Sequence, residues 1–244
     1  MSSTAAIELK NITKTFGSVV ANNNICLTVN KGEILSILGE NGSGKTTLMN
    51  MISGIYFPDH GQIFVDGKEA IIASPKDAFD YKIGMIHQHF KLVDVFSATE
   101  NIILGSGKKG KYNLKKSAEE VKEISEKYGF DIDPFKKIYE MSVSEKQTVE
   151  IIKVLYRGAD ILILDEPTAF LDYPSKAETM RLLKSITMAG GAPGSRVTAL
   201  LSTHDMEMAL RLTDRLWVMT SDRTLCTGTP GELHEVLKKE KLIF

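Results

Sequence analysis

The sequence has few of the features that mark secreted, membrane-spanning or metal-binding proteins. Its 244 residues include two cysteines, Cys26 and Cys226, whose separation fits no metal or redox motif. We therefore predict that both are small, buried residues in a reducing compartment. No apolar run approaches the roughly 20 residues of a membrane helix. Residues 1–6 are small and uncharged beyond the terminus, so we expect a soluble chain without a signal peptide.

The sequence also lacks an excess of charge of either sign. It has 30 lysines and arginines and 31 aspartates and glutamates, which gives a net charge of −1. A protein whose main partner is nucleic acid is expected to carry a basic face, so we expect no nucleic-acid partner. Internal repeats and low-complexity tracts are absent. With 43% hydrophobic residues, the length suits one large α/β domain with a small insertion.

One glycine-rich stretch fits the phosphate-binding pattern G-x-x-x-x-G-K-[ST], and it reads Gly39-Glu40-Asn41-Gly42-Ser43-Gly44-Lys45-Thr46. The apolar segment 34–38 before it predicts a buried strand, and the segment 46–52 after it predicts a helix. Glycines let several N–H groups face one phosphate, and the helix N-terminus adds roughly half a positive charge. Lys45 adds a full charge and Thr46 a hydroxyl for magnesium, so we predict a polyphosphate site rather than a surface turn.

Strands and helices alternate along most of the chain. Apolar patterns predict strands at residues 7–12, 25–29, 62–65, 83–86, 161–164, 197–201, 216–219 and 224–226. Helical patterns occur at residues 144–156, 174–188, 206–212 and 232–239, with loops at residues 189–194 and 221–223. Asp66-Gly67 marks a hairpin. We predict the α/β fold of a P-loop NTPase, with a RecA-like, doubly wound core and an antiparallel β subdomain.

A lysine- and glutamate-rich region interrupts this alternation. Residues 107–128 place apolar residues at helical spacing among charged ones. We predict a single domain, residues 1–244, with a core at residues 1–88 and 149–244 and an inserted α-helical subdomain at about residues 89–148. The charged run is expected to be a solvated face, and contact with a partner is the less favoured interpretation.

Two carboxylates follow the fully apolar run at residues 161–164. Open α/β sheets bind ligands at the carboxyl ends of such central strands, which is where Asp165 and Glu166 would lie. Asp165 suits a hydrogen bond to a magnesium-bound water, and Glu166 suits activation of the water that attacks a γ-phosphate. The alternative is an acidic pair that only caps a neighbouring helix. The nearby phosphate loop favours the catalytic interpretation.

These motifs, in this order, resemble the nucleotide-binding subunit of ATP-binding-cassette (ABC) transporters over residues 7 to about 237. The phosphate loop and residues 161–166 correspond to the family's two Walker motifs. The resemblance implies an ATPase that uses Mg²⁺, with Lys45, Glu166 and His204 as catalytic residues; His204 lies in the switch region at residues 200–205. It implies ATP contacts from Phe16, which would stack on adenine, and from Gly39, Asn41, Gly42, Ser43, Gly44, Lys45, Thr46 and Thr47.

The resemblance also implies partners and a location. Thr46, Gln88 and Asp165 would hold the metal, and Gln88 would sense a membrane subunit. Asp172 would end the loop that crosses the interface of a homo- or heterodimer of nucleotide-binding domains. Hydrolysis would energise import through integral-membrane permeases, with the chain in the cytoplasm, peripheral on the inner face of the cell membrane. The plain alternatives are a core role for Phe16 and a structural role for His204.

One motif departs from the family. The signature Leu-Ser-Gly-Gly-Gln, which closes on the ATP of the other subunit, is replaced here by Met141-Ser142-Val143-Ser144-Glu145. This assigns Ser142 and Ser144 to the site of the opposite subunit. Ser144 replaces the second glycine and would crowd the γ-phosphate, and Glu145 adds negative charge near it. We therefore expect weaker or asymmetric closure on ATP.

The two parts of the chain resemble different branches of the family. Residues 31–166, including Gly84-Met85-Ile86-His87-Gln88-His89-Phe90, are similar to nucleoside or simple-sugar import ATPases, which usually carry two cassettes in one chain. Residues from 167 onward, including Ala169-Phe170-Leu171-Asp172-Tyr173-Pro174-Ser175, are similar to iron-chelate or cobalamin import ATPases. We expect a natural mosaic or a chimera joined near residues 165–171. The substrate class stays open, with more weight on the front part.

Other functions remain as alternatives. The chain could be a degenerate nucleotide-binding partner with weak hydrolysis, or a soluble ABC ATPase without permeases. DNA-repair members of that kind need long coiled-coil arms, and no sustained heptads occur here. A P-loop kinase or GTPase is disfavoured because the sequence has no Asn-Lys-x-Asp base-reading motif.

Overall fold

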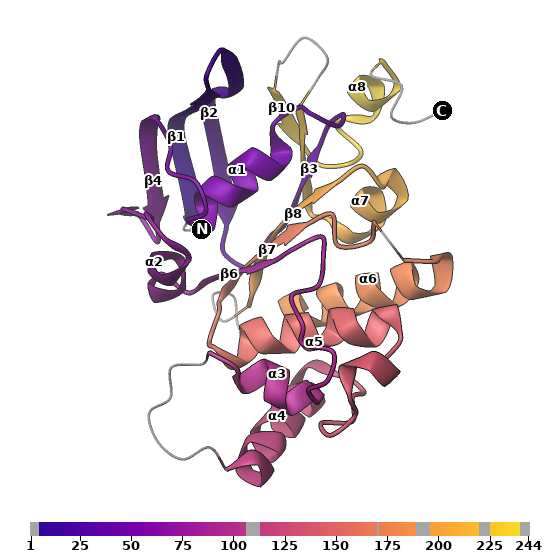
Figure 1. Ribbon diagram of the computed structural model, residues 1–244. Coiled ribbons are helices and arrows are strands. Elements are labelled where there is room, and N and C mark those ends of the chain that lie inside the picture. The colour runs from indigo at the N-terminus through magenta and orange to yellow at the C-terminus, as the bar shows by residue number, and fades with distance from the viewer. Residues whose placement is uncertain (1–4, 106–112, 170, 189–195, 220–224, 240–244) are drawn as a thin grey trace.

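The computed structural model describes residues 5–105, 113–169, 171–188, 196–219 and 225–239. In these residues, two β-sheets and the helices around them form a layered α/β structure (Figure 1). None of the helices in this part of the chain is both long enough and apolar enough to span a membrane. The two predicted loops, at residues 189–194 and 221–223, lie outside the described residues.

The larger sheet has six strands in the order β10-β9-β3-β8-β7-β6. The five parallel strands are β3 (Ile34–Leu38), β6 (Ile83–Ile86), β7 (Ile161–Asp165), β8 (Thr198–Thr203) and β9 (Arg215–Met219), and β10 (Leu225–Gly228) pairs antiparallel at one edge. Every residue of β3, β7 and β8 is buried, which explains their nearly continuous apolar runs. The carboxyl ends of these three neighbouring strands therefore meet at one edge of the sheet.

The smaller sheet is antiparallel, with β1 (Ala5–Phe16), β2 (Val19–Asn30), β4 (His60–Val65) and β5 (Lys68–Ala70) in the order β2-β1-β4-β5. Asp66 and Gly67 form the predicted hairpin turn between β4 and β5, both with positive φ. Helix α1 (Lys45–Ile52) packs between the two sheets, where its apolar side chains share one core with both. This layer fixes the phosphate loop that precedes α1.

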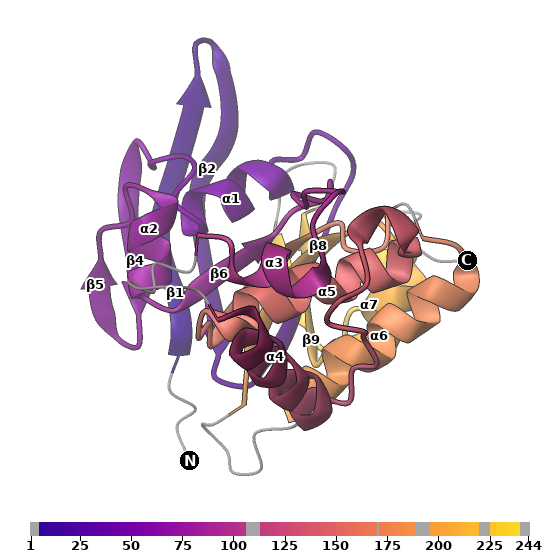
Figure 2. The ribbon, with the colours of Figure 1, turned by 60° about the horizontal axis from the view of Figure 1, so that its bottom comes forward.

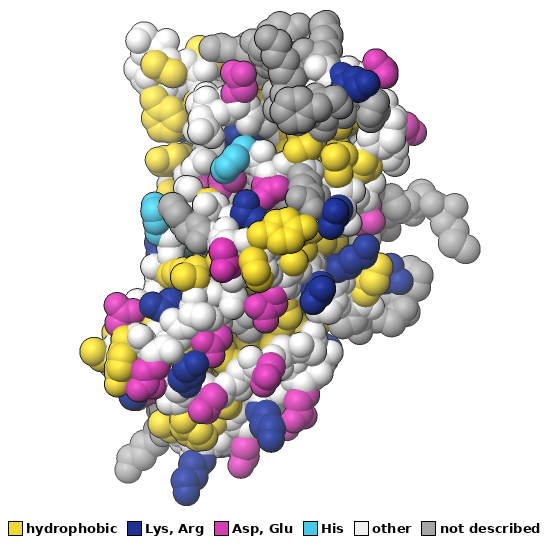
Figure 3. Space-filling model, turned by 90° about the vertical axis from the view of Figure 1, so that its right-hand side faces the viewer, with side chains coloured by type: hydrophobic (Ala, Val, Ile, Leu, Met, Phe, Trp, Pro, Cys, Tyr) yellow, Lys and Arg dark blue, Asp and Glu magenta, His cyan; other side chains and the backbone are white. Residues whose placement is uncertain are grey.

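The remaining helices are α2 (Pro75–Asp80), α3 (Ala98–Ile103), α4 (Leu114–Tyr128), α5 (Val143–Tyr156), α6 (Tyr173–Met188), α7 (Met206–Leu212) and α8 (His234–Lys239), with a short 3₁₀ turn at Ile138–Glu140. A second core joins α5 and α6 to the other face of the large sheet. Helices α3 and α4 lie beyond α5, at the end of the molecule away from the small sheet (Figures 1 and 2). The corresponding end carries interspersed acidic and basic side chains (Figure 3).

The α/β architecture and the antiparallel subdomain are confirmed, and a helical region does follow β6. The division into a core at residues 1–88 and 149–244 and an insert at 89–148 stays a prediction. Helix α5 is continuous across residue 148 and shares a core with the large sheet. Helix α2 was not predicted, although Ser74 caps it and Pro75 occupies its first turn.

The prediction that both cysteines are buried is wrong for Cys26, which is exposed. Successive side chains of a strand point to opposite faces of a sheet. On β2 the core face receives Ile25 and Leu27, so Cys26 between them points outward. Cys226 is partly buried, against the core that β9 and α8 share.

Candidate active site

The phosphate loop, residues 39–46, joins β3 to α1 at the carboxyl end of the parallel strands. Gly44 immediately precedes α1 and has a φ of 98°. A Cβ atom at this position would lie 2.3 Å from the main-chain oxygen of Ala21, so a side chain would be both strained and sterically blocked. Strand β2, which contains Ala21, therefore packs directly against the phosphate loop.

Lys45 is almost fully enclosed by this loop. It is 6% exposed, and its Nζ donates hydrogen bonds to the main-chain oxygens of Gly39 (2.7 Å) and Glu40 (2.9 Å). Burial lowers the pKa of Lys45, while the carboxylates of Glu166 and Asp165 act in the opposite direction. A phosphate oxygen would offer this ammonium group a stronger, charge-assisted acceptor than either carbonyl.

Asp165 ends β7 and links three elements. Its Oδ1 accepts a hydrogen bond from the Ser202 hydroxyl on β8 (2.5 Å) and one from the Thr46 hydroxyl on α1 (3.3 Å). Sequence reasoning did not single out Ser202 as a site residue. Its one local signal is a polar side chain in a strand that is otherwise mostly apolar.

Glu166 has an unusual backbone conformation for a non-glycine residue, with a φ of 49°. Its main-chain N–H donates to the main-chain oxygen of Ser202 (3.1 Å) and to the Ser202 hydroxyl (3.2 Å). Ser202 thus contacts both acids, and it holds the turn that places the Glu166 carboxylate just beyond the strand. Strain of this kind often occurs at functional sites, where the surrounding structure enforces it.

His204 follows β8 and contacts Glu166. Its Nδ1 lies 2.8 Å from Glu166 Oε2, and its main-chain N–H donates to the same oxygen at 3.4 Å. The imidazole is 61% exposed, so its other nitrogen is open to a ligand. The next residue, Asp205, pairs with Lys176 of α6 (2.7 Å), which anchors the turn that carries His204.

Seven of the predicted site residues line one cavity of about 170 Å³; these are Asn41, Gly42, Lys45, Thr46, Gln88, Glu166 and His204. Gln88 reaches it from the segment after β6, which lies at the edge of the sheet. The Thr46 hydroxyl, the Gln88 amide and the adjacent Asp165 carboxylate supply the hard oxygen donors that Mg²⁺ prefers. The residues therefore fit a magnesium-bound phosphate group.

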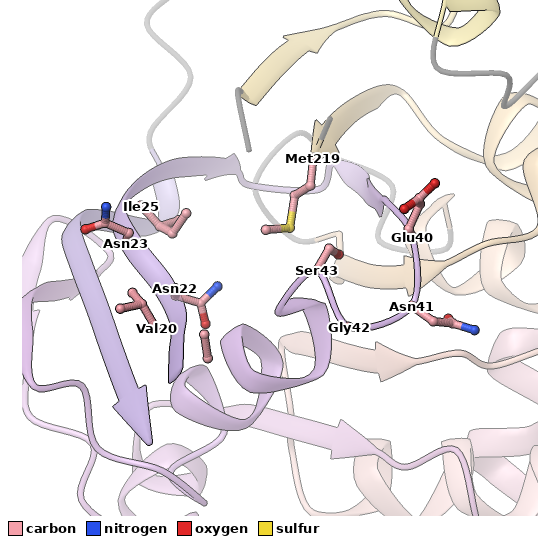
Figure 4. Close-up of a pocket in the computed structure, with 10 residues that line it drawn as sticks. Val20, Asn22, Asn23, Ile25, Glu40, Asn41, Gly42, Ser43 and Met219 are labelled. Carbon is pink, nitrogen blue, oxygen red and sulfur yellow. The ribbon is translucent and has the colours of Figure 1, made fainter. Parts of the chain in front are cut away.

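A second cavity, of about 260 Å³, lies between β2 and the phosphate loop, and Met219 also borders it (Figure 4). Asn22 of β2 is buried beside it, and its Nδ2 donates to the main-chain oxygen of Gly44 (3.4 Å). Within the described residues, Asn22 Oδ1 and the Ser43 hydroxyl are buried without a hydrogen-bond partner. No local pattern pointed to Asn22, because its contact with the loop spans 22 residues of sequence.

Phe16 and Thr47 are the remaining predicted ATP contacts. Phe16 ends β1, is 44% exposed, and packs edge-to-face on Tyr56 with ring centroids 5.3 Å apart. Its exposure disfavours the alternative of a core aromatic and leaves part of the ring open for stacking. Thr47 lies in the first turn of α1 and is partly buried.

The residues predicted to act on the opposite subunit's ATP lie at two helix starts. Ser142 caps α5 in a capping box with Glu145, and the Ser144 hydroxyl lies 3.2 Å from the Ser142 hydroxyl. Asp172 accepts a hydrogen bond from the Ser175 N–H at the start of α6 (3.0 Å), and hydrogen bonding to the Ser175 side chain, together with this main-chain bond, lowers the pKa of Asp172. None of these residues lines the 170 Å³ cavity of its own chain.

The charge of Glu145 is compensated, which qualifies the expectation that it would repel a phosphate. Its Oε1 lies 2.6 Å from Lys136 Nζ, and its Oε2 accepts from the Ser142 N–H (2.7 Å). Burial raises the pKa of Glu145, but the hydrogen bonds from Lys136 and Ser142 outweigh it and the net shift is downward. The carboxylate thus stays ionised and paired.

Comparison with known proteins identifies the class to which this fold and site belong. A family model described as ABC transporter matches residues 22–169, and the chain belongs to this family. The nucleoside import ATP-binding protein NupA of Lactococcus lactis is 42% identical over 234 residues, covering 95% of this chain and 45% of that protein. The guanosine import ATP-binding protein NupO of Bacillus subtilis is 50% identical over 186 residues, covering 75% of this chain and 36% of that protein.

The chain thus spans less than half the length of these two relatives. Solved structures match this chain over most of the length of both proteins. CbiO1 of Clostridium perfringens, part of the ABC transporter complex CbiONQ, is 28% identical with a TM-score of 0.80, covering 98% of this chain and 95% of that chain. The bacterial ABC transporter cassette MJ0796, solved as a dimer, is 27% identical with a TM-score of 0.72, covering 87% and 93%. The predicted P-loop NTPase fold of an ABC ATPase is therefore confirmed.

Proposed function

We propose that this chain is the ATP-binding and ATP-hydrolysing cassette of an ABC importer. The observation that carries the proposal is the single cavity that Lys45 and Thr46 share with Glu166 and His204. A phosphate held by the loop would lie beside a nearly buried carboxylate and a histidine. A glycine-rich surface turn or a helix-capping acidic pair would not require that arrangement.

In the proposed reaction, Lys45 and the N–H groups of the phosphate loop hold the β- and γ-phosphates. Bound magnesium, held by Thr46 and Gln88 with Asp165 behind, would offset the negative charge that develops on the phosphate oxygens. Glu166 orients the attacking water and accepts its proton as the bond to ADP breaks. His204 donates a hydrogen bond to the γ-phosphate and keeps Glu166 in place.

The proposed unit of function is a dimer of cassettes. Ser142, Ser144 and Asp172 do not line the 170 Å³ cavity of their own chain, so in this proposal they would act at the site of another cassette. The dimeric state of MJ0796 supports a partner cassette that supplies the equivalent groups. Either a second copy or a related cassette satisfies this geometry.

The proposed membrane partners are permease subunits, which would hold the chain on the inner face of the cell membrane. This partner assignment is supported by the relatives NupA and NupO, which are both named as import ATP-binding proteins. Several large apolar residues from the segment after β6 to the first residue of α5 are exposed and suit contact with another protein; these are Val95, Phe135, Tyr139 and Val143. They belong to the region predicted as an inserted helical subdomain, residues 89–148.

For the cargo, we favour a nucleoside or a simple sugar. The named relatives are nucleoside and guanosine import proteins, and NupA matches 95% of this chain, including its C-terminal part. The resemblance of residues after 166 to iron-chelate or cobalamin import ATPases, and a mosaic origin, stay predictions. Transport assays of the cassette with its permeases, using guanosine and ribose as competing cargoes, would test the preference.

A second candidate function is a partner cassette that binds ATP but hydrolyses it weakly. It is favoured by one observation, the serine at position 144 in place of the signature's second glycine. The cavity formed by the chain's own residues is equally compatible with it. A soluble ABC ATPase without permeases is less favoured, because both named relatives are import proteins.

ATP hydrolysis by the purified chain tests the main proposal. Glu166→Gln keeps the size of the side chain but removes the base, so the turnover rate should fall by about 100-fold or more while Mg-ATP affinity is kept. Glu126→Gln, an exposed acid on α4, is the matched control and should behave like the parent. Equal rates for the parent and Glu166→Gln would contradict the catalytic assignment, and a parent that binds ATP without turnover would favour the weak partner.

A further inference from the structure

Two charged side chains of α5, the buried Glu150 and the partly buried Lys153, have no part in the proposed chemistry. Glu150 is 5% exposed, and its Oε1 accepts a hydrogen bond from the main-chain N–H of Lys91 (2.8 Å). Lys153, almost one turn later on α5, donates from Nζ to the main-chain oxygen of the same residue (3.0 Å). Two charged side chains of one helix thus hold both main-chain groups of Lys91. We call this arrangement the Lys91 clamp.

The two charges of the Lys91 clamp also compensate each other. Lys153 Nζ lies 3.8 Å from Glu150 Oε1, and 15% of the Lys153 side chain is exposed. Burial lowers the pKa of Lys153, and the neighbouring Glu150 acts against that shift. Buried ion pairs seldom add stability compared with apolar side chains of the same size. The clamp is therefore better explained by what it positions than by the free energy of folding it contributes.

The clamp holds the segment that carries Gln88. This segment, residues 87–96, leaves β6 and passes along α5 toward α3 (Figures 1 and 2). Two residues beyond Lys91, the same device recurs. The buried Asn101 accepts a hydrogen bond from the Val93 N–H (2.7 Å) and donates to the Val93 oxygen (3.1 Å). The segment pairs with no strand among the described residues, and side chains of α5 and α3 supply hydrogen bonds that a neighbouring strand would otherwise provide.

The same segment is attached to the residues just before Ser142. The main-chain oxygen of Asp94 accepts from the Tyr139 N–H (3.2 Å), and that of Phe96 accepts from the Ile138 N–H (3.0 Å). Ser142 then caps α5, and Glu150 lies about 12 Å further along the helix. The Gln88 segment is thus fixed both to the body of α5 and to the chain that enters it.

We propose that Glu150 and Lys153 are positioning residues that make the Gln88 segment and α5 a single unit. This inference rests on the proposed function, in which Gln88 contacts magnesium in its own site and Ser142 contacts the ATP of the partner cassette. Through the clamp, the position of Gln88 and the position of Ser142 are set together. Without it, Lys91 would exchange these hydrogen bonds with water, and the segment that carries Gln88 would be held less firmly against α5.

The test uses the full chain and three substitutions. Glu150→Leu removes the acceptor at similar volume, Glu150→Gln keeps a neutral acceptor, and Lys153→Met removes the donor. Lys82→Met is the matched control, because Lys82 also pairs with an acid but at the exposed surface. Amide hydrogen–deuterium exchange is measured across the chain, together with the Mg²⁺ concentration that gives half-maximal ATP hydrolysis.

Exchange in residues 87–96 should rise about tenfold or more in Glu150→Leu, and less in Glu150→Gln, while the central strands β7 and β8 keep the parent's protection. The half-maximal Mg²⁺ concentration should rise severalfold with the KM for ATP less affected, and Lys82→Met should match the parent. Unchanged exchange in residues 87–96, or an equal rise in β7 and β8, would overturn the inference. Absence of hydrolysis in the parent would instead reject the proposed function, while the exchange measurement still decides whether the clamp holds the segment.

Discussion

The Nδ1 atom of His204 lies 2.8 Å from Oε2 of Glu166, and the His204 main-chain N–H approaches the same oxygen at 3.4 Å. One carboxylate oxygen of Glu166 is thus held by a single residue that directly follows the neighbouring strand β8, while Lys45 and the phosphate loop face the same cavity. The arrangement leaves Glu166 with a fixed orientation before any substrate binds. In the proposed reaction, the two residues therefore act as a pair.

His204→Ala should lower kcat for ATP hydrolysis by about 100-fold and change Mg-ATP affinity much less, because the histidine orients the base and makes one contact with the γ-phosphate, whereas Lys45 and the phosphate loop hold the phosphate chain. The double variant with Glu166→Gln should be no slower than Glu166→Gln alone, since residues that act as a unit are not additive. His60→Ala, an exposed histidine on β4, is the control. Additive losses in the double variant would show that the two residues act separately.

Two glycines of the phosphate loop should respond differently to substitution. Gly42 and Gly44 both have positive φ, so alanine costs about 1–2 kcal/mol at either position. At Gly42 the added Cβ meets nothing within 4 Å, whereas at Gly44 it lies 2.3 Å from the Ala21 oxygen. Urea unfolding without nucleotide should therefore show a clearly larger loss of stability for Gly44→Ala. Similar losses of stability for the two variants would mean that β2 can shift to make room for the added methyl group at position 44.

Ser144→Gly should increase ATP turnover, because it restores the small residue that the family uses against the partner's γ-phosphate. The effect should appear only at protein concentrations that allow dimers. The substitution also places glycine in the first turn of α5, at a cost of up to about 1 kcal/mol in helix stability. Thr148→Ala is a control further along α5. It removes the hydrogen bond from the Thr148 hydroxyl to the Ser144 main-chain oxygen but leaves the Ser144 side chain in place. Equal turnover of Ser144→Gly and the parent would show that Ser144 does not limit closure.

Asp59 should make stability depend on pH in acid. Hydrogen bonds from Lys14 and Thr15 lower its pKa from 3.8 to about 2. Because the folded-state pKa lies below the unfolded one, its stabilisation is present above about pH 4 and is lost as the pH falls toward 2. Between pH 5 and 2.5, the unfolding temperature of Asp59→Asn should fall less than that of the parent. Asp131→Asn, an exposed control, should follow the parent.

Much of the site could be predicted from the sequence because its parts are local. The phosphate loop is continuous, and the apolar runs before Gly39 and Asp165 identify two buried parallel strands whose carboxyl ends lie at one edge. Strand periodicity and loop chemistry were sufficient for these residues. His204, which follows β8, was assigned through the resemblance to the ABC family instead.

Other features depend on which elements become neighbours, and no local pattern encodes that. Ser202 reaches both acids only because β8 lies next to β7, and Asn22 reaches Gly44 only because the small sheet packs on the loop. The outward position of Cys26 depends on which face of β2 the core covers. The Lys91 clamp joins residues 59 and 62 positions apart. Long-range contacts of this kind require the fold itself.

In the large sheet, β8 separates the strand of the phosphate loop from the strand of the two acids. Any exchange of the C-terminal segment, by recombination or in the laboratory, would therefore graft a new strand into the middle of the core rather than onto its edge. The incoming strand would have to match β3 on one side and β7 on the other, with Leu200 and Leu201 facing opposite layers. The incoming strand would first need a hydroxyl at position 202, because the Ser202 hydroxyl contacts both Asp165 and Glu166.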